Sequence, residues 1–104
     1  MTNEEKQKLN NKIHGWIIPN SDLTFGEADE MCACDFFNDF NACIKWFIPS
    51  LAGKIRAITL YPGVPCCELT LMDGSFEEGI GDTLTLAFCL ASEKLIDNET
   101  QGKR

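Results

Sequence analysis

His14 is the single histidine of the chain and the first candidate for acid–base catalysis. No motif places a serine or cysteine nucleophile beside it, so as a general base it would lack the partner that such catalysis needs. We expect His14 to be a solvated side chain that interacts with the C-terminal dipole of a helix. The sequence contains no G-x-S-x-G, P-loop, G-x-G-x-x-G or H-E-x-x-H motif. We therefore predict a protein that is not an enzyme.

Six cysteines raise the question of a metal site: Cys32, Cys34, Cys43, Cys66, Cys67 and Cys89. Zinc sites favour pairs of cysteines two to four residues apart at matched spacing, which Cys32-x-Cys34 does not provide. Cys66 and Cys67 are adjacent, and successive side chains of a strand point to opposite faces. We expect free thiols, kept reduced because the polar N-terminus carries no secretory signal. The sequence thus predicts a cytoplasmic protein without a metal or another cofactor.

Carboxylates interleaved with aromatic residues form the most distinctive segment of the chain. Between Asp22 and Asp39 there are six acidic residues and no lysine or arginine. The spacing does not match a calcium-binding EF-hand loop. Aromatic anchors beside carboxylates suit a surface that binds a basic protein. The predicted partner-binding residues are Asp22, Phe25, Glu27, Asp29, Glu30, Asp35, Phe36 and Asp39. The alternative is a solvated acidic face over core aromatics.

A second hypothesis uses the basic residues. A small anionic ligand, such as a nucleotide immune signal held by a sponge protein, would need cationic donors. The available ones are Lys45, Lys54, Arg56 and Lys94. The backbone N–H groups before the last helix are another conceivable anion site, but Asp82 would repel a phosphate there. We expect Gly81 and Asp82 to turn the chain and cap the helix.

Composition limits the class of protein. The chain has 104 residues, 16 acidic and 9 basic side chains, a net charge of -7 and 44% hydrophobic residues. A chain of this size buries about two thirds of the surface that its unfolded form exposes. We predict one domain, 1–104, with a core of about 3–97 and a polar tail, 98–104. The acid excess argues against direct binding of nucleic acid, and no apolar stretch is long enough for a membrane span.

The first half of the chain predicts two helices. The capping box Thr2-x-x-Glu5 indicates a helix from about residue 3 to His14, ended by Gly15, with Leu9, Ile13 and Trp16 facing inward. Residues 20–35 show no hydrophobic period and are expected to form a long loop. A second helix begins near Asn38 or Asp39, with its inward stripe formed by Phe40, Cys43, Ile44 and Phe47. Pro49 is expected to end or kink that helix.

The second half predicts a β-meander and a helix. Segments 54–61, 65–72 and 75–80 alternate with the period of strands and are separated by Pro62-Gly63 and Asp73-Gly74. Apolar residues on both faces of the first two strands predict that both faces of the sheet are covered. Glu77 and Glu78 mark the third strand as a charged edge. A last helix follows Asp82-Thr83 and is apolar nearly all round. The predicted fold is α+β, a three-stranded antiparallel meander between helix layers.

Three segments resemble the phage ABA sandwich domain of small phage and prophage proteins. They are Leu9–Ile13 with Gly15-Trp16, the second helix start at Asn38–Cys43, and the last helix start at Asp82–Ala91. The chain departs from the family pattern at Thr85, where a proline is usual, and at Leu90, where a basic residue is usual. The resemblance implies a sheet between helix layers and a phage or mobile-element origin. It implies no catalytic residues.

Together these features predict a small acidic phage or prophage accessory protein. We expect it to bind and inhibit a host protein in the host cytoplasm, similar in size and charge to anti-defence inhibitors such as anti-CRISPR proteins. A nucleic-acid-binding defence protein is the expected kind of host partner, because an acidic surface can occupy a basic channel. The alternatives are the small-ligand binder, which would form its pocket as a homo-oligomer, and a structural or interaction module.

Overall fold

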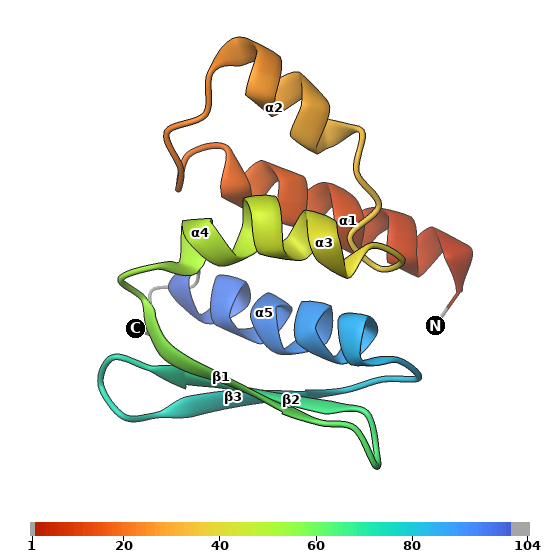
Figure 1. Cartoon of the computed structure of the whole chain (residues 1–104), viewed down its shortest axis with the longest axis vertical. Coiled ribbons are helices and arrows are strands. Elements are labelled where there is room, and N and C mark those ends of the chain that lie inside the picture. Colours follow the sequence, from red (N-terminus) through yellow and green to blue (C-terminus); the bar gives the residue numbers. More distant parts are fainter. Residues whose placement is uncertain (1, 101–104) are drawn as a thin grey trace. The chain divides into compact units, whose positions relative to one another are not determined.

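A computed structural model describes residues 2–100 of the chain (Figure 1). Its helices and its three-stranded antiparallel sheet confirm the predicted α+β class. The chain divides after Leu51 into two units, Met1–Leu51 and Ala52–Arg104. The first unit is helical, and the second contains the sheet and the last helix.

Helix α1 (Asn3–Ile17) begins with the predicted capping box, in which Thr2 and Glu5 each bond the backbone N–H of the other. The prediction that Gly15 ends this helix is wrong. The helix continues to Ile17, and the N–H of Ile18 still bonds the carbonyl of His14 at 3.3 Å. Its buried face therefore includes Ile17, whereas Trp16 is only half-buried.

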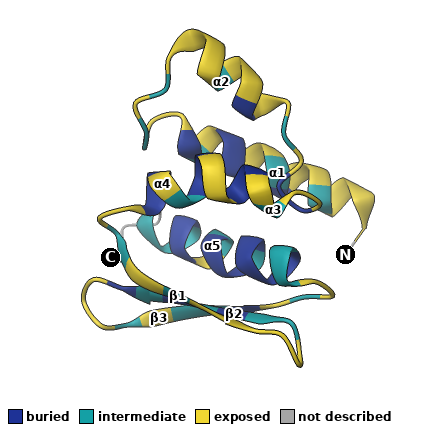
Figure 2. Ribbon diagram, in the orientation of Figure 1, coloured by how far each residue is buried: buried dark blue, intermediate teal, exposed yellow. Residues whose placement is uncertain are grey.

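Helix α2 (Phe25–Cys32) occupies the segment predicted to be a loop, so that prediction is wrong. A second capping box starts it, because the Thr24 hydroxyl accepts from the Glu27 N–H and the Glu27 carboxylate accepts from the Thr24 N–H. Met31 is its one buried residue. An eight-residue helix that buries one side chain leaves no hydrophobic period in the sequence, and Figure 2 shows most of α2 exposed.

The second predicted helix is a continuous helical segment with a wide turn at its centre. It comprises α3 (Phe40–Ala42), the π-helix η1 (Cys43–Phe47) and α4 (Ile48–Leu51). Asp39 caps its start by accepting a hydrogen bond from the N–H of Ala42 at 3.2 Å. Pro49 does not end the helix. The preceding turn widens instead, with the N–H of Ile48 bonded to the carbonyl of Cys43, which relieves the clash between a proline ring and the carbonyl four residues earlier.

The wide turn changes which side chains face inward. A π turn takes more residues than an α turn, so an α-helical period does not assign all of its side chains to the right faces. Ile44, predicted to face the core, is 51% exposed, whereas Cys43, Trp46 and Phe47 are buried. The predicted stripe is therefore correct for Cys43 and Phe47 and wrong for Ile44.

The sheet of the second unit contains β1 (Ile55–Tyr61), β2 (Cys66–Leu71) and β3 (Phe76–Ile80) in the order β1-β2-β3. Both pairings are antiparallel, which confirms the predicted meander. Gly74 lies in the β2–β3 turn with a φ of 90°, a conformation that favours glycine. A bulge between Ile55 and Ala57 shifts the register at the start of β1.

Helix α5 (Leu84–Thr100) packs on one face of this sheet, against β2 and β3 (Figure 1). Thr83, and not Asp82, caps it by accepting from the N–H of Leu86 at 3.1 Å. The predicted burial nearly all round is confirmed by Leu86, Ala87, Phe88, Cys89, Ala91, Ser92, Leu95 and Ile96. The helix runs into the predicted polar tail, whose residues 101–104 lie outside the described part of the chain.

The two faces of the sheet differ sharply. Cys67, Leu69 and Leu71 point toward α5 and are buried. The opposite face, called the outer face below, contains Tyr61, Phe76 and Ile80 in the paired register, and all three are strongly exposed. The prediction that both faces are covered is therefore wrong. Tyr61 and its neighbours belong to a surface that faces solvent.

Gly79 sets the distance between helix and sheet. Its inward position faces the α5 backbone so closely that a Cβ atom there would lie 2.3 Å from the Ala87 carbonyl oxygen and 2.4 Å from the Ala91 nitrogen. Both clashing atoms are backbone atoms, which cannot rotate away. The small side chains of Ala87 and Ala91, both fully buried, complete this close packing.

We expect Gly79→Ala to destabilise the protein by about 3 kcal/mol or more, because the helix backbone must move off the sheet. The matched control is Gly63→Ala in the β1–β2 turn, where a Cβ atom meets nothing within 4 Å. Urea unfolding of both variants measures the difference. Equal free energies of unfolding for the two variants would show that the close approach of Gly79 to α5 does not contribute to stability.

Candidate functional site

The predicted partner-binding residues have different roles in the structure, and Phe36 is not a surface residue. Its side chain is fully buried. Its ring contacts His14 edge-on, with centroids 5.2 Å apart, and lies 5.9 Å from the ring of Phe47. The prediction of Phe36 as an interface anchor is therefore wrong, because the core of the first unit holds it.

Three of the predicted carboxylates stabilise local backbone. Glu27 completes the α2 capping box, and the hydrogen bonds from the Thr24 backbone and hydroxyl lower the pKa of its carboxyl. Asp35 accepts from the N–H of Phe37 at 3.2 Å and from the Asn38 amide at 2.6 Å. Asp39 caps α3. These three carboxylates remain exposed, but each already accepts a hydrogen bond from a backbone N–H group and so has a structural role.

Glu30 takes part in an exposed ion pair. Its carboxylate lies 3.5 Å from the Lys45 ammonium, and both side chains are more than half exposed. The same ammonium sits 4.7 Å from the centre of the Trp46 ring. Exposed pairs of this kind contribute little to stability, so Glu30 can exchange Lys45 for another cation at small cost.

The remaining predicted residues form what is called the α2 surface below: Asp22, Phe25, Asp29 and Glu30. Phe25 is the first residue of α2 and is 90% exposed. Asp22 and Asp29 are exposed and take no part in the caps described above. An almost fully exposed phenylalanine is unusual on a folded domain, since its burial is worth about 2 kcal/mol. The α2 surface is therefore the part of the predicted site that the fold leaves available.

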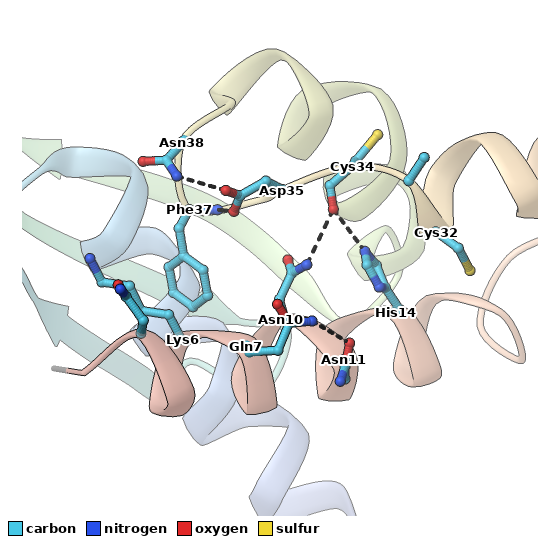
Figure 3. A pocket seen from close by; sticks show the side chains of 12 residues that line it. Lys6, Gln7, Asn10, Asn11, His14, Cys32, Cys34, Asp35, Phe37 and Asn38 are labelled. Carbon is cyan, nitrogen blue, oxygen red and sulfur yellow. Dashed lines mark hydrogen bonds between the residues drawn. The ribbon is translucent and has the colours of Figure 1, made fainter.

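Sequence reasoning missed a polar groove between α1 and the segment 32–38, with a volume of about 460 Å³ (Figure 3). Asn10 joins its two sides, because its amide donates to the Cys34 carbonyl at 3.2 Å and its oxygen accepts from the Phe36 N–H at 3.1 Å. His14 bonds the same carbonyl through Nε2 at 3.0 Å. The two side chains fasten the segment after α2 to α1.

In the groove, His14 and the Cys34 thiol bond different partners. His14 meets the backbone oxygen of Cys34, while the Cys34 thiol donates to the Glu30 carbonyl at 3.5 Å. Burial and the nearby Asp39 raise the pKa of that thiol, so the reactive thiolate is disfavoured. His14 is buried, which corrects the expectation of a solvated histidine. Its hydrogen bond to the Cys34 carbonyl explains why His14 lies in the groove.

The four basic residues of the ligand-binding hypothesis are divided between the two units. Lys45 belongs to the first unit and pairs with Glu30. In the second unit, Lys54 pairs with Glu99 at 3.4 Å beside β1, whereas Lys94 donates to the carbonyl of Glu78 in β3, at the other edge of the sheet. Arg56 is exposed on β1. Among residues 52–100, Lys54 and Lys94 therefore lie at opposite edges of the sheet and do not converge on one anion site.

The cysteines are free thiols, and Cys66 and Cys67 point to opposite faces of β2, in register with Ile80 and Gly79. Within residues 2–100, no group of three or more His, Cys, Asp or Glu side chains lies close enough to hold a metal ion. Burial raises the pKa of Cys67 to about 12, with smaller effects from Cys66 and Glu68.

Comparisons of the chain with protein-family models, with curated proteins and with solved structures gave no match in any of the three. The resemblance to the phage ABA sandwich domain stays a prediction from three sequence segments. Among the described helices, none combines the length and apolar character needed to cross a bilayer.

Titration of His14 tests its burial. Desolvation lowers its pKa below the ordinary 6.5, against opposing effects of the Cys34 carbonyl and Asp35. Because the folded-state pKa is lowered, the unfolded chain protonates His14 at a higher pH than the folded chain does. The contribution of neutral, buried His14 to the free energy of unfolding is therefore complete above pH 6.5 and is lost as the pH falls through the folded-state pKa. The single imidazole signal in NMR reports the pKa directly. A midpoint above 6.5 would contradict the buried placement.

Alkylation tests the thiol assignments. We expect iodoacetamide at pH 8 to modify exposed Cys32 well before Cys67, because Cys67 is fully buried and its thiolate is rare at that pH. Mass spectrometry of peptides after timed quenching measures both rates. In urea the two rates should converge, and equal rates in the folded protein would contradict the buried position of Cys67.

Proposed function

We propose that this protein is a non-enzymatic binding protein that inhibits a basic host protein through the α2 surface. The observation that carries the proposal is the exposure of Phe25, 90%, at the start of a helix flanked by exposed carboxylates. An aromatic residue in this setting gains free energy when a partner covers it.

The charge of α2 favours a basic partner. Asp22, Asp29 and Glu30 surround the position of Phe25 along the chain, and the segment from Asp22 to Asp39 contains no lysine or arginine. Glu30 of this surface pairs with Lys45 in an exposed ion pair of small energy. Long-range attraction would speed association with a positively charged protein and make its rate fall with salt.

The proposal agrees with the chemistry of the rest of the first unit. Its histidine is buried against a backbone carbonyl, and the neighbouring Cys34 thiol has a raised pKa. The groove beside α1 is lined by amides that already bond one another or the backbone, such as Gln7 with Asn11. Binding needs no catalytic group, whereas an enzymatic role would need an activated one.

The biological setting follows from the sequence. The three segments that resemble the phage ABA sandwich domain support a phage or prophage origin, and a protein of this size and charge fits an anti-defence inhibitor of the anti-CRISPR kind. Its target would then be a host defence protein with a basic nucleic-acid channel, reached in the host cytoplasm. Carboxylates around Phe25 would occupy cationic sites that otherwise hold phosphates.

Substitution of Phe25 tests the proposal. We expect Phe25→Ala to weaken capture of the host partner at least about tenfold, because loss of a central aromatic anchor costs about 2 kcal/mol. The measurement is affinity capture from host lysate, followed by titration of the identified partner. Ile44→Ala is the matched control, since it removes another exposed apolar side chain of the same unit.

The charge component is tested separately with Asp22→Asn and Asp29→Asn. We expect both to slow association at low salt, with little effect from the exposed control Glu4→Gln on α1. A partner that binds Phe25→Ala as tightly as the unchanged protein would refute the α2 surface as the binding site. Association that ignores both salt and these carboxylates would refute the basic partner.

A further inference from the structure

The two edges of the sheet are chemically different, and β1 is the open one. In the described part of the chain β1 has a strand neighbour on one side only, although its first residue, Ile55, also forms an isolated parallel bridge with Ala52. Every second residue of such an edge directs its N–H and C=O groups away from the sheet. β1 carries a single charged side chain, Arg56, and is otherwise composed of residues that favour strands.

The β3 edge is protected by its own side chains. Glu77 and Glu78 place two charges on a five-residue strand, which discourages another strand from pairing with it. The Lys94 ammonium, 2.5 Å away, occupies the Glu78 carbonyl, and the Asn98 amide donates to the Glu77 carboxylate. A strand could therefore be added at β1 but not at β3.

Helix α5 leaves β1 uncovered as well as unpaired. The helix packs on β2 and β3. Leu60, whose paired register places it on the same face as buried Cys67, is 36% exposed, and Ile58 is only half-buried. On the outer face Ala57, Thr59 and Tyr61 are exposed. The strand thus has accessible apolar surface on both faces.

We propose that β1 pairs antiparallel with β1 of a second copy, joining two sheets into one of six strands. A two-fold axis near Ile58 places Ala57 of each copy beside Thr59 of the other. Such pairing satisfies the outward backbone groups of both strands and brings together the partly exposed Ile58 and Leu60 of each copy. This association does not depend on the partner-binding role of the α2 surface.

Charge favours a second copy as the occupant. β1 has no carboxylate, so the pairing joins two chains of net charge -7 along a stretch that carries no acidic side chain. In the antiparallel arrangement Arg56 of one copy lies near the Tyr61 end of the other. Each copy thus brings the one charge of its β1, a cation, toward a chain whose net charge is negative.

Thr59→Lys tests the pairing, because it places an ammonium group at the centre of the shared edge and near Arg56 of the other copy. Thr59 is exposed, so the fold of one chain should survive, which circular dichroism checks. We expect sedimentation velocity to give the mass of two chains for the unchanged protein and at least about tenfold weaker association for Thr59→Lys. The matched control is Val64→Lys in the β1–β2 turn, which is 68% exposed and should associate normally.

A second variant tests the charge argument. Arg56→Glu should also weaken association, because it replaces the one cation of β1 with a carboxylate and so sets like charges against each other. Hydrogen exchange gives an independent readout, with outward amides of β1 protected in the unchanged protein and exposed in Thr59→Lys. A single-chain mass at all concentrations would overturn the proposal. So would a dimer that persists in Thr59→Lys, or protection of β1 by a host protein in place of a second copy.

Discussion

The contact between the α5 backbone and Gly79 is the constraint on which the second unit depends. A helix usually keeps its distance from a sheet because side chains lie between them. Here Gly79 on the strand and Ala87 and Ala91 on the helix let the two backbones meet directly. The contact fixes α5 over the β3 side of the sheet, so β1 is left at its margin. The close approach of α5 to Gly79 therefore accounts both for the buried face of β2 and for the exposure of β1.

The first unit is held in a different way, by polar side chains that bond the backbone. Asn10 and His14 both reach the carbonyl of Cys34, while Thr24 and Asp39 cap short helices. Short helices with few buried residues need such bonds, because the hydrophobic effect alone would not order them. Many of the polar residues that make the sequence look like an interaction surface are therefore structural, and of the predicted partner-binding residues the α2 surface is what remains without such a role.

Sequence patterns predict the second unit well because its strands and helix bury regular faces. The meander follows from period-two segments between Pro62-Gly63 and Asp73-Gly74, and α5 follows from its apolar residues. The same patterns miss α2, although Thr24-x-x-Glu27 repeats the capping box signal of Thr2-x-x-Glu5. That signal was available in the sequence, but without a hydrophobic stripe behind it a cap alone does not indicate a helix.

Other differences have causes that no local pattern reports. Ile44 faces outward because a π turn upstream of Pro49 alters the helical period. Phe36 and His14 are buried because distant residues of α1 and η1 contact them. For the candidate site, the sequence predicted the acidic segment and Phe25. It could not separate the carboxylates that cap helices from those that remain available, since that separation depends on hydrogen-bond geometry.

The unequal edges of the sheet also limit how far assembly can proceed. A sheet with two open edges can accept strands at both sides, and each addition then exposes a new edge that accepts the next, which is the geometry of a fibre. Glu77, Glu78 and the Lys94 contact close one side of this sheet. If β1 pairs with a second copy as proposed, growth by strand addition would stop there, because the charges on β3 leave no second edge for another strand.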